Sequence, residues 1–164
     1  MMRMSKRFRI LWQEERLDDL LPSIALQPSL RALVEARLVE RAGGLLLEPL
    51  AEHVTGREAF QDCTAYEAFV NKIHIDDFID NKRPTERERL GLLVQQGVKA
   101  ALVLSERLVH EGSYRVLLCL DEQDPTMTLR FFKHRPGEMW GGDDPDAFPL
   151  EEMLIIDASL CHSD

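Results

Sequence analysis

The most regular pattern of apolar and polar positions lies in the middle of the chain. Thr85 is followed three residues later by Glu88, which is the sequence of a helix-capping box. Apolar or small residues then recur at spacings of four and three, typical of one helix face: Leu90, Val94, Gly97, Ala101, Leu104 and Leu108. The pattern predicts one long helix from about Glu86 to Glu111.

Three β-rich runs follow this predicted helix. YRVLLCLD and TMTLRFFKHR flank the polar turn DEQDP, which indicates an antiparallel hairpin, and LEEMLIID follows the loop GEMWGGDDPDAF as a third strand. We expect the long helix to cover one face of this sheet, because apolar residues such as Val116, Leu118, Leu120, Leu129 and Phe131 need an apolar partner. Helices first and strands last indicate an α+β fold, with N-terminal helices and one long central helix packed on a mainly antiparallel C-terminal sheet.

The amino-terminal part shows shorter helical patterns. One helix is predicted from Phe8 to Leu21, where Pro22 stops it. A second is predicted from an N-cap at Ser29, with Leu30, Leu33, Val34 and Leu38 on one face and Gly43-Gly44 as its stop. The following LLLEPLAEHV predicts a short strand that is interrupted at Pro49, and then a brief helix up to Val54.

The segment FVNKIHIDDFI alternates between two sets of side chains. Val70, Lys72, His74 and Asp76 form one set, while Asn71, Ile73 and Ile75 form the other. The alternation predicts a strand with one polar face. On that face His74 and Asp76 could orient an imidazole as a general base, but a surface histidine beside solvated carboxylates is the more ordinary interpretation.

Composition indicates a folded chain and one domain. The 164 residues are 45% hydrophobic and 30% charged, so we expect a single globular domain over 1–164, in which residues 1–55 could form a helical subdomain. Cys63, Cys119 and Cys161 form no C-x-x-C pair. With no signal-peptide pattern and no apolar run of about 20 residues, we expect reduced thiols, a cytoplasmic protein and no membrane association.

The chain contains none of the common motifs of catalysis or metal binding. Its five histidines have no helical metal-ligand spacing, and neither G-x-G-x-x-G nor a P-loop occurs. The acidic loop after the second strand lacks the ligand series of an EF-hand. We therefore expect a non-catalytic protein without a cofactor or metal. An enzyme whose site is assembled from distant positions stays an alternative.

Charge is distributed unevenly along the chain. The formal net charge is −9, and residues 113–164 carry four Lys or Arg against eleven Asp or Glu. Such a field attracts basic partners and repels nucleic acid, although it also simply keeps a protein soluble. The candidate docking residues are Asp121, Glu122 and Asp124 in the hairpin turn, and Trp140, Asp143, Asp144 and Asp146 in the next loop. Trp140 could be a binding hot spot or an ordinary core tryptophan.

Two resemblances go with these hypotheses. In overall character the chain is similar to small acidic immunity proteins, which neutralise nucleic-acid-cleaving toxins; this implies a basic protein partner. Residues 28–54, PSLRALVEARLVERAGGLLLEPLAEHV, resemble the end of a winged-helix module, in which a recognition helix runs into a glycine turn and a wing. That resemblance implies an alternative function as a nucleic-acid-binding regulator. Arg31, Arg37 and Arg41 would then contact phosphates, but acidic neighbours make this alternative the weaker one.

Overall fold

The computed structural model describes residues 1–52, 56–80, 85–138, 140–148 and 150–159. The first half contains β1 (Met2–Met4), α1 (Lys6–Glu14), α2 (Leu17–Leu20), α3 (Pro28–Val34), β2 (Leu38–Arg41), β3 (Gly44–Leu47), α4 (Glu48–Ala51) and η1 (Arg57–Ala59). The second half contains α5 (Cys63–Val70), β4 (Ile73–His74), η2 (Ile75–Phe78), α6 (Glu86–Leu108), β5 (Tyr114–Asp121), β6 (Thr126–Lys133), η3 (Pro145–Ala147) and β7 (Glu152–Ala158).

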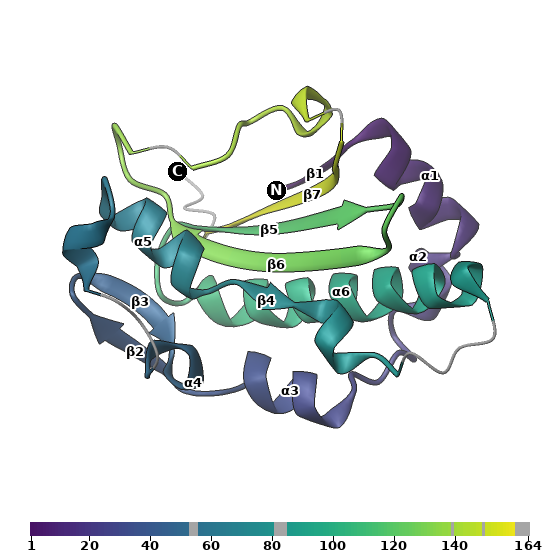
Figure 1. Cartoon of the computed structure of the whole chain (residues 1–164), viewed down its shortest axis with the longest axis horizontal. Helices are drawn as coiled ribbons and strands as arrows, with labels where there is room; N and C mark the ends of the chain where they lie inside the picture. Colours follow the sequence, from purple (N-terminus) through teal and green to yellow (C-terminus); the bar gives the residue numbers. More distant parts are fainter. Residues whose placement is uncertain (53–55, 81–84, 139, 149, 160–164) are drawn as a thin grey trace.

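A five-stranded antiparallel sheet is the centre of the fold, with strand order β1-β7-β5-β6-β4 (Figure 1). Helix α6 lies across one face, which we call the helix face. This arrangement confirms the α+β class, the long helix, the β5–β6 hairpin and the third strand β7. The capping box is also confirmed, because the Glu88 amide donates to the Thr85 hydroxyl at 3.1 Å. The helix ends at Leu108, three residues before the predicted end.

The helix face is covered by apolar side chains almost throughout. Val116, Leu118, Leu120, Leu129 and Phe131 from β5 and β6 are fully buried in one cluster with α6 residues such as Leu104. Side chains of the N-terminal helices, including Phe8 of α1 and Leu30 of α3, are buried in the same cluster. A Cβ on Gly97 would clash with the Met127 sulfur, so this glycine allows α6 to approach the sheet closely.

The first predicted helix is interrupted, which corrects the prediction of one helix from Phe8 to Leu21. Arg16 adopts a left-handed backbone conformation with φ of 50°, and it separates α1 from α2. The indole nitrogen of Trp12 donates to the Asp18 carboxylate at 3.0 Å across this break. The break places both Trp12 and Leu17 in the core, which a straight helix with this sequence would not do.

The second helix, α3, is shorter than predicted. Helix α3 begins at Pro28, with Gln27 as N-cap and not Ser29, and it ends at Val34. Arg107 of α6 donates to the carbonyl of Val34, the last residue of α3, and to the carbonyl of Ala36 just beyond the helix end. Leu38 then belongs to strand β2, which pairs with β3 around the turn at Ala42-Gly43. The strand and the brief helix predicted after Gly44 are observed as β3 and α4, while Val54 lies outside the described residues.

The strand predicted from FVNKIHIDDFI is mostly wrong. Its beginning is the end of helix α5, whose N-cap Asp62 accepts from the Ala65 amide at 2.7 Å. Only Ile73 and His74 form a strand, and Asp76 lies in η2, so His74 and Asp76 do not share a strand face. The Asp76 carboxylate instead accepts from the Met127 amide at 3.1 Å, which replaces a further strand-to-strand bond along β6.

Candidate functional site

The face of the sheet opposite α6, here called the open face, has a different cover. Helix α5 lies over one part of it, and the described residues between His134 and Glu151, here called the arch, run along the rest (Figure 1). Its apolar cluster is small and contains Ala68, Leu117, Cys119, Phe132, Met153 and Ile155, with Trp140 and Phe148 of the arch packed against it. Charged residues surround this cluster.

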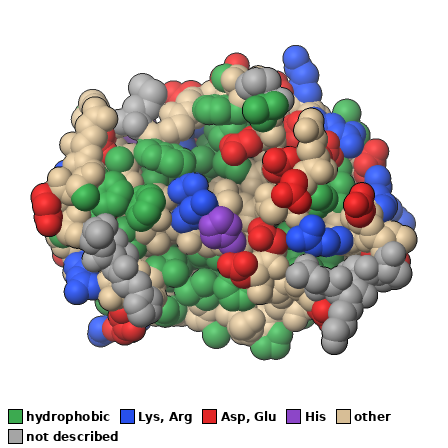
Figure 2. All heavy atoms as spheres, viewed as in Figure 1, with side chains coloured by type: hydrophobic (Ala, Val, Ile, Leu, Met, Phe, Trp, Pro, Cys, Tyr) green, Lys and Arg blue, Asp and Glu red, His purple; other side chains and the backbone are tan. Residues whose placement is uncertain are grey.

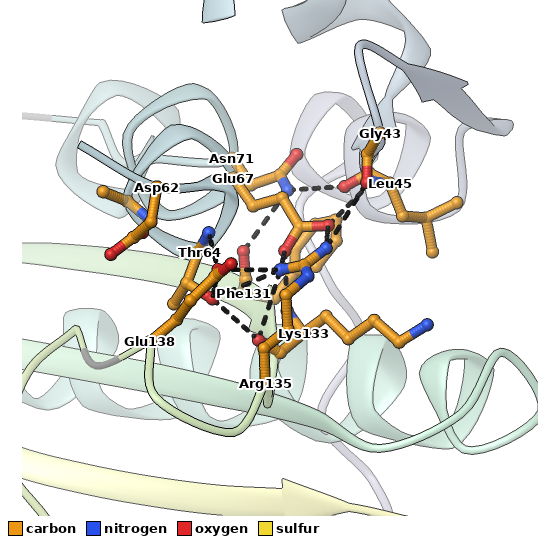
Figure 3. A network of polar contacts seen from close by, with 11 residues as sticks. Gly43, Leu45, Asp62, Thr64, Glu67, Asn71, Phe131, Lys133, Arg135 and Glu138 are labelled. Atoms are coloured by element: carbon orange, nitrogen blue, oxygen red, sulfur yellow. Dashed lines mark hydrogen bonds and ion pairs between the residues drawn. The ribbon is translucent and has the colours of Figure 1, made fainter. Parts of the chain in front are cut away.

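A buried ionic network anchors α5 and the β2–β3 hairpin to the end of β6 (Figure 3). Glu67 is fully buried, and its carboxylate accepts from both terminal nitrogens of Arg135, at 2.7 and 3.0 Å. It also accepts from the amides of Leu45 and Lys133, each at 2.8 Å. The hydrogen bond and charge of Glu67 raise the pKa of Arg135 despite its partial burial. Every acceptor site of this carboxylate is used internally, which indicates a structural role.

Neighbouring polar side chains complete this network. The Asn71 amide accepts from the Leu47 amide at 3.1 Å and donates to the Leu45 carbonyl at 2.9 Å and the Phe131 carbonyl at 3.3 Å. Burial of Glu138 opposes its ionisation, but hydrogen bonds from the amide and hydroxyl of Thr64 outweigh this and lower its pKa. The β2–β3 hairpin is therefore held by side chains of α5 more than by the main sheet.

A second ionic network ties strands β1, β5 and β7 to the arch. Asp157 of β7 accepts from Arg115 at 2.9 Å and from Arg3 at 2.7 Å, and Arg115 also pairs with Asp143 at 2.9 Å. Burial of Asp157 opposes its ionisation, but hydrogen bonds and charges from Arg115 and Arg3 outweigh it and lower the pKa of this carboxyl. Asp143 is a predicted docking residue, and its side chain remains 75% exposed despite the ion pair.

The other acidic candidates also take part in local structure. Asp121 accepts from the amides of Gln123 and Asp124 in the β5–β6 turn, and Glu122 pairs with Arg7 at 2.9 Å. In the arch, Asp144 accepts from the Asp146 amide at 3.0 Å, and Asp146 accepts from the Lys6 amide at 2.8 Å.

The two acidic loops meet at the start of α1. Glu122 and Asp146 contact the consecutive residues Arg7 and Lys6, so the β5–β6 turn and the arch lie next to the same helix end. Trp140 lies elsewhere, over Phe132 with ring centroids 5.8 Å apart. Trp140 packs against the cluster that contains Leu117 of β5. Leu117 precedes Asp121 by four residues, which corresponds to about 13 Å along the strand. Trp140 therefore does not lie at the place where the two acidic loops meet.

Residues of η2 join the acidic turn, which the sequence analysis did not anticipate. The bond from the Met127 amide to Asp76 places η2 beside the β5–β6 turn, since Thr126 is paired with Asp121. Asp76, Asp77, Asp121, Glu122 and Asp124 are here called the acidic end. Acidic side chains are more frequent on the right half of the face in Figure 2, where η2 and this turn lie. Among the described residues, Asp77 and Asp124 form no ion pair.

Other functional classes find less support in the geometry. In the winged-helix-like segment, Arg31 pairs with Glu35, Arg37 pairs with Glu48, and Arg41 donates to the Ala51 carbonyl. All three arginines are thus occupied within the chain. Burial raises the pKa of the Cys119 thiol to about 12, so this cysteine is not a thiolate nucleophile at neutral pH.

The described residues contain no candidate metal site and no candidate membrane span. No group of three or more His, Cys, Asp or Glu side chains there has the arrangement of a metal site. Likewise, no helix within the described ranges combines the length and the apolar character that crossing a bilayer requires.

Comparison with known proteins gives a family and no further relative. No curated protein and no solved structure matches this chain. One family model matches residues 7–162, which include every helix and strand from α2 to β7 and most of α1. Because this match extends over nearly the whole chain, the protein belongs to the Uncharacterized protein PM0498 family.

Proposed function

We propose that this protein binds a basic protein partner through its acidic end and has no catalytic role. The observation that carries the proposal is the meeting of carboxylates from η2 and from the β5–β6 turn, about 45 residues apart in the sequence, at one end of the sheet. A net charge of −9 adds a long-range attraction for a basic surface.

The partial order of the acidic end favours binding over mere solubility. Asp76 and Asp121 are fixed by backbone amides, at 3.1 and 2.9 Å respectively, so the turn and η2 are held in position before any partner arrives. Asp77 and Asp124 are exposed on this ordered support. Carboxylates carried on an ordered backbone lose less conformational entropy on binding than carboxylates carried on a flexible segment.

The proposal predicts how the complex forms as well as where. Exposed carboxylates at the rim of an interface mainly increase the association rate, and salt screens their effect. A partner recognised by the acidic end should therefore associate more slowly as the salt concentration rises, with a smaller change in the dissociation rate.

The test is affinity capture from the native host with three forms of the full chain. The first is the wild type, and the second carries Asp77→Asn with Asp124→Asn. The third carries Glu106→Gln with Glu111→Gln, which makes the same change in net charge near the opposite end of α6. We expect a stoichiometric basic protein to be retained by the wild type and the third form and lost from the second.

Two results would contradict the proposal. One is retention of the same partner by the wild type and by the Asp77→Asn, Asp124→Asn form with equal association rates in surface-plasmon kinetics. The other is equal loss from both variants, because this would show a dependence on net charge and not on the acidic end. Circular dichroism of all three forms establishes that the substitutions leave the fold intact.

A further inference from the structure

A pocket of about 250 Å³ lies between the open face of the sheet and the arch. Its base is formed by strand residues and its outer wall by the arch; the lining residues are Leu117, Cys119, Thr128, Arg130, Trp140, Gly141, Phe148, Glu151 and Met153. The aromatic rings of Trp140 and Phe148 and the side chains of Leu117 and Met153 form the apolar part of this surface, and polar groups line the rest.

Arg130 is the cation of this pocket. Its guanidinium lies 4.8 Å from the centroid of the Trp140 ring, and one terminal nitrogen donates to the Ala68 carbonyl at 3.1 Å. It forms no ion pair with any carboxylate of the described residues. Burial lowers the pKa of this guanidinium, and the nearby charge of Glu151 offsets the desolvation only in part. An anion bound beside it would supply the missing compensation.

Glu151 is the second charged group of the pocket and limits where an anion can lie. It is exposed, and it lies near enough to Cys119 for a side-chain hydrogen bond that helps to raise the thiol's pKa. Its carboxylate makes no ion pair with Arg130 within 4 Å. An anionic group therefore has its favourable position on the side of Arg130 and Trp140, away from Glu151.

We propose that this pocket binds a small amphipathic carboxylate, whose acid group pairs with Arg130 and whose apolar body lies between Trp140, Phe148 and Leu117. The planar guanidinium fork matches a carboxylate with two parallel hydrogen bonds. A pocket of this size is below the usual range for drug-sized ligands, so the ligand is a small aromatic or branched organic acid and not a peptide or a dinucleotide.

The two tryptophans of the chain provide a probe and its internal control. Trp140 lines the pocket, whereas Trp12 is 8% exposed in the helix-face core with its indole nitrogen bonded to Asp18. The experiment follows both indole N–H signals in ¹⁵N-correlation spectra of the full chain during titration with phenylacetate. We expect a saturable shift of the Trp140 signal with a dissociation constant of roughly 0.1–1 mM, and no shift of the Trp12 signal.

Matched ligands separate the charge from the apolar body. Phenylacetamide has the same shape without the charge, and we expect it to bind at least tenfold more weakly. Inorganic phosphate has the charge without the apolar body and should not displace phenylacetate. Equal binding of the amide, displacement by phosphate at equal concentration, or no saturable shift with phenylacetate would each overturn the proposal.

Two variants locate the binding site. Arg130→Gln should weaken phenylacetate binding at least tenfold, while Arg9→Gln, on the exposed surface of α1, should leave it unchanged. Because Arg130→Gln also removes the bond to Ala68, Phe148→Ala serves as a second variant that keeps the guanidinium and removes one apolar wall. Unchanged affinity in either pocket variant would overturn the proposal. Its outcome is independent of partner capture by the acidic end, which these ligands and variants do not involve.

Discussion

The two faces of the sheet are stabilised in different ways. The helix face is covered by one long amphipathic helix, and its apolar cluster includes residues of β4, β5, β6 and β7. The open face has only a small apolar cluster, and two ionic networks centred on Glu67 and Asp157 hold its cover in place. An apolar core tolerates small changes in packing geometry, whereas a buried charge network is stable only when each partner is present. The open face is therefore the more sensitive to single polar substitutions.

Glu67→Ala should have the largest effect, because it leaves three internal donors without their acceptor. They are the guanidinium of Arg135 and the amides of Leu45 and Lys133. We expect the free energy of unfolding to fall by about 3–5 kcal/mol, the cost of breaking a buried ion pair from one side. Urea denaturation measures this loss of unfolding free energy. The matched control is Glu35→Ala, whose ion pair with Arg31 is exposed and should contribute less than about 1 kcal/mol.

A loss below about 1 kcal/mol in Glu67→Ala would show that the network is not needed to hold α5. In that case the contrast between the two faces would reduce to a difference in apolar area alone.

Leu104→Ala tests the helix face in the same way. Leu104 is fully buried between α6 and the sheet, so truncation should lower the free energy of unfolding by about 2–5 kcal/mol. The control is Val103→Ala, whose side chain is only partly buried on the same helix and should cost less. Equal losses in the two variants would contradict the assignment of Leu104 to the core.

Much of the helix face could be predicted from the sequence, and little of the open face could. The capping box at Thr85 and the spacing of Leu90 to Leu108 are local patterns that one helix satisfies by itself. The open face depends on Glu67, Asn71 and Arg135, whose roles exist only when α5, β3 and β6 meet. Buried polar residues also disturb the apolar periodicity of α5, so the sequence pattern does not indicate this helix, and its last residues, Phe69 and Val70, fall within the predicted strand.

The acidic candidates show the same division between local and distant information. Sequence could locate the carboxylates of the β5–β6 turn and the arch, but it could not show that Glu122 pairs with Arg7 or that Asp146 accepts from the Lys6 amide. The basic residues Lys6 and Arg7 were the one sequence feature that indicated a possible partner for the acidic loops within the chain. Nothing local connected Asp76 to Met127.

Asp157→Asn should change the pH dependence of stability. Because Arg115 and Arg3 lower the folded-state pKa of Asp157, its ionised form stabilises the fold at pH values above its ordinary pKa of 3.8. This contribution is lost as the pH falls below 3.8 and through the lowered folded-state pKa. We expect Asp157→Asn to cost about 1–2 kcal/mol at pH 7 and to lose less stability than the wild type on acidification. Thermal melts between pH 7 and pH 2 measure both effects, and parallel pH curves for the two proteins would contradict this account.

Asp143→Asn should have the smallest effect on stability, although Asp143 belongs to the same network. Its side chain is 75% exposed, so water and salt screen its pair with Arg115, and the expected loss is at most about 0.5 kcal/mol. Arg115 retains Asp157 as a partner at 2.9 Å in this variant, so no buried charge is left without compensation. Urea denaturation of Asp143→Asn and Asp157→Asn therefore compares the contributions to stability of two carboxylates that both pair with Arg115 and differ mainly in exposure. Equal losses of stability in the two variants would contradict this account. They would show that the exposed ion pair of Asp143 stabilises the fold as much as the more buried ion pair of Asp157 does.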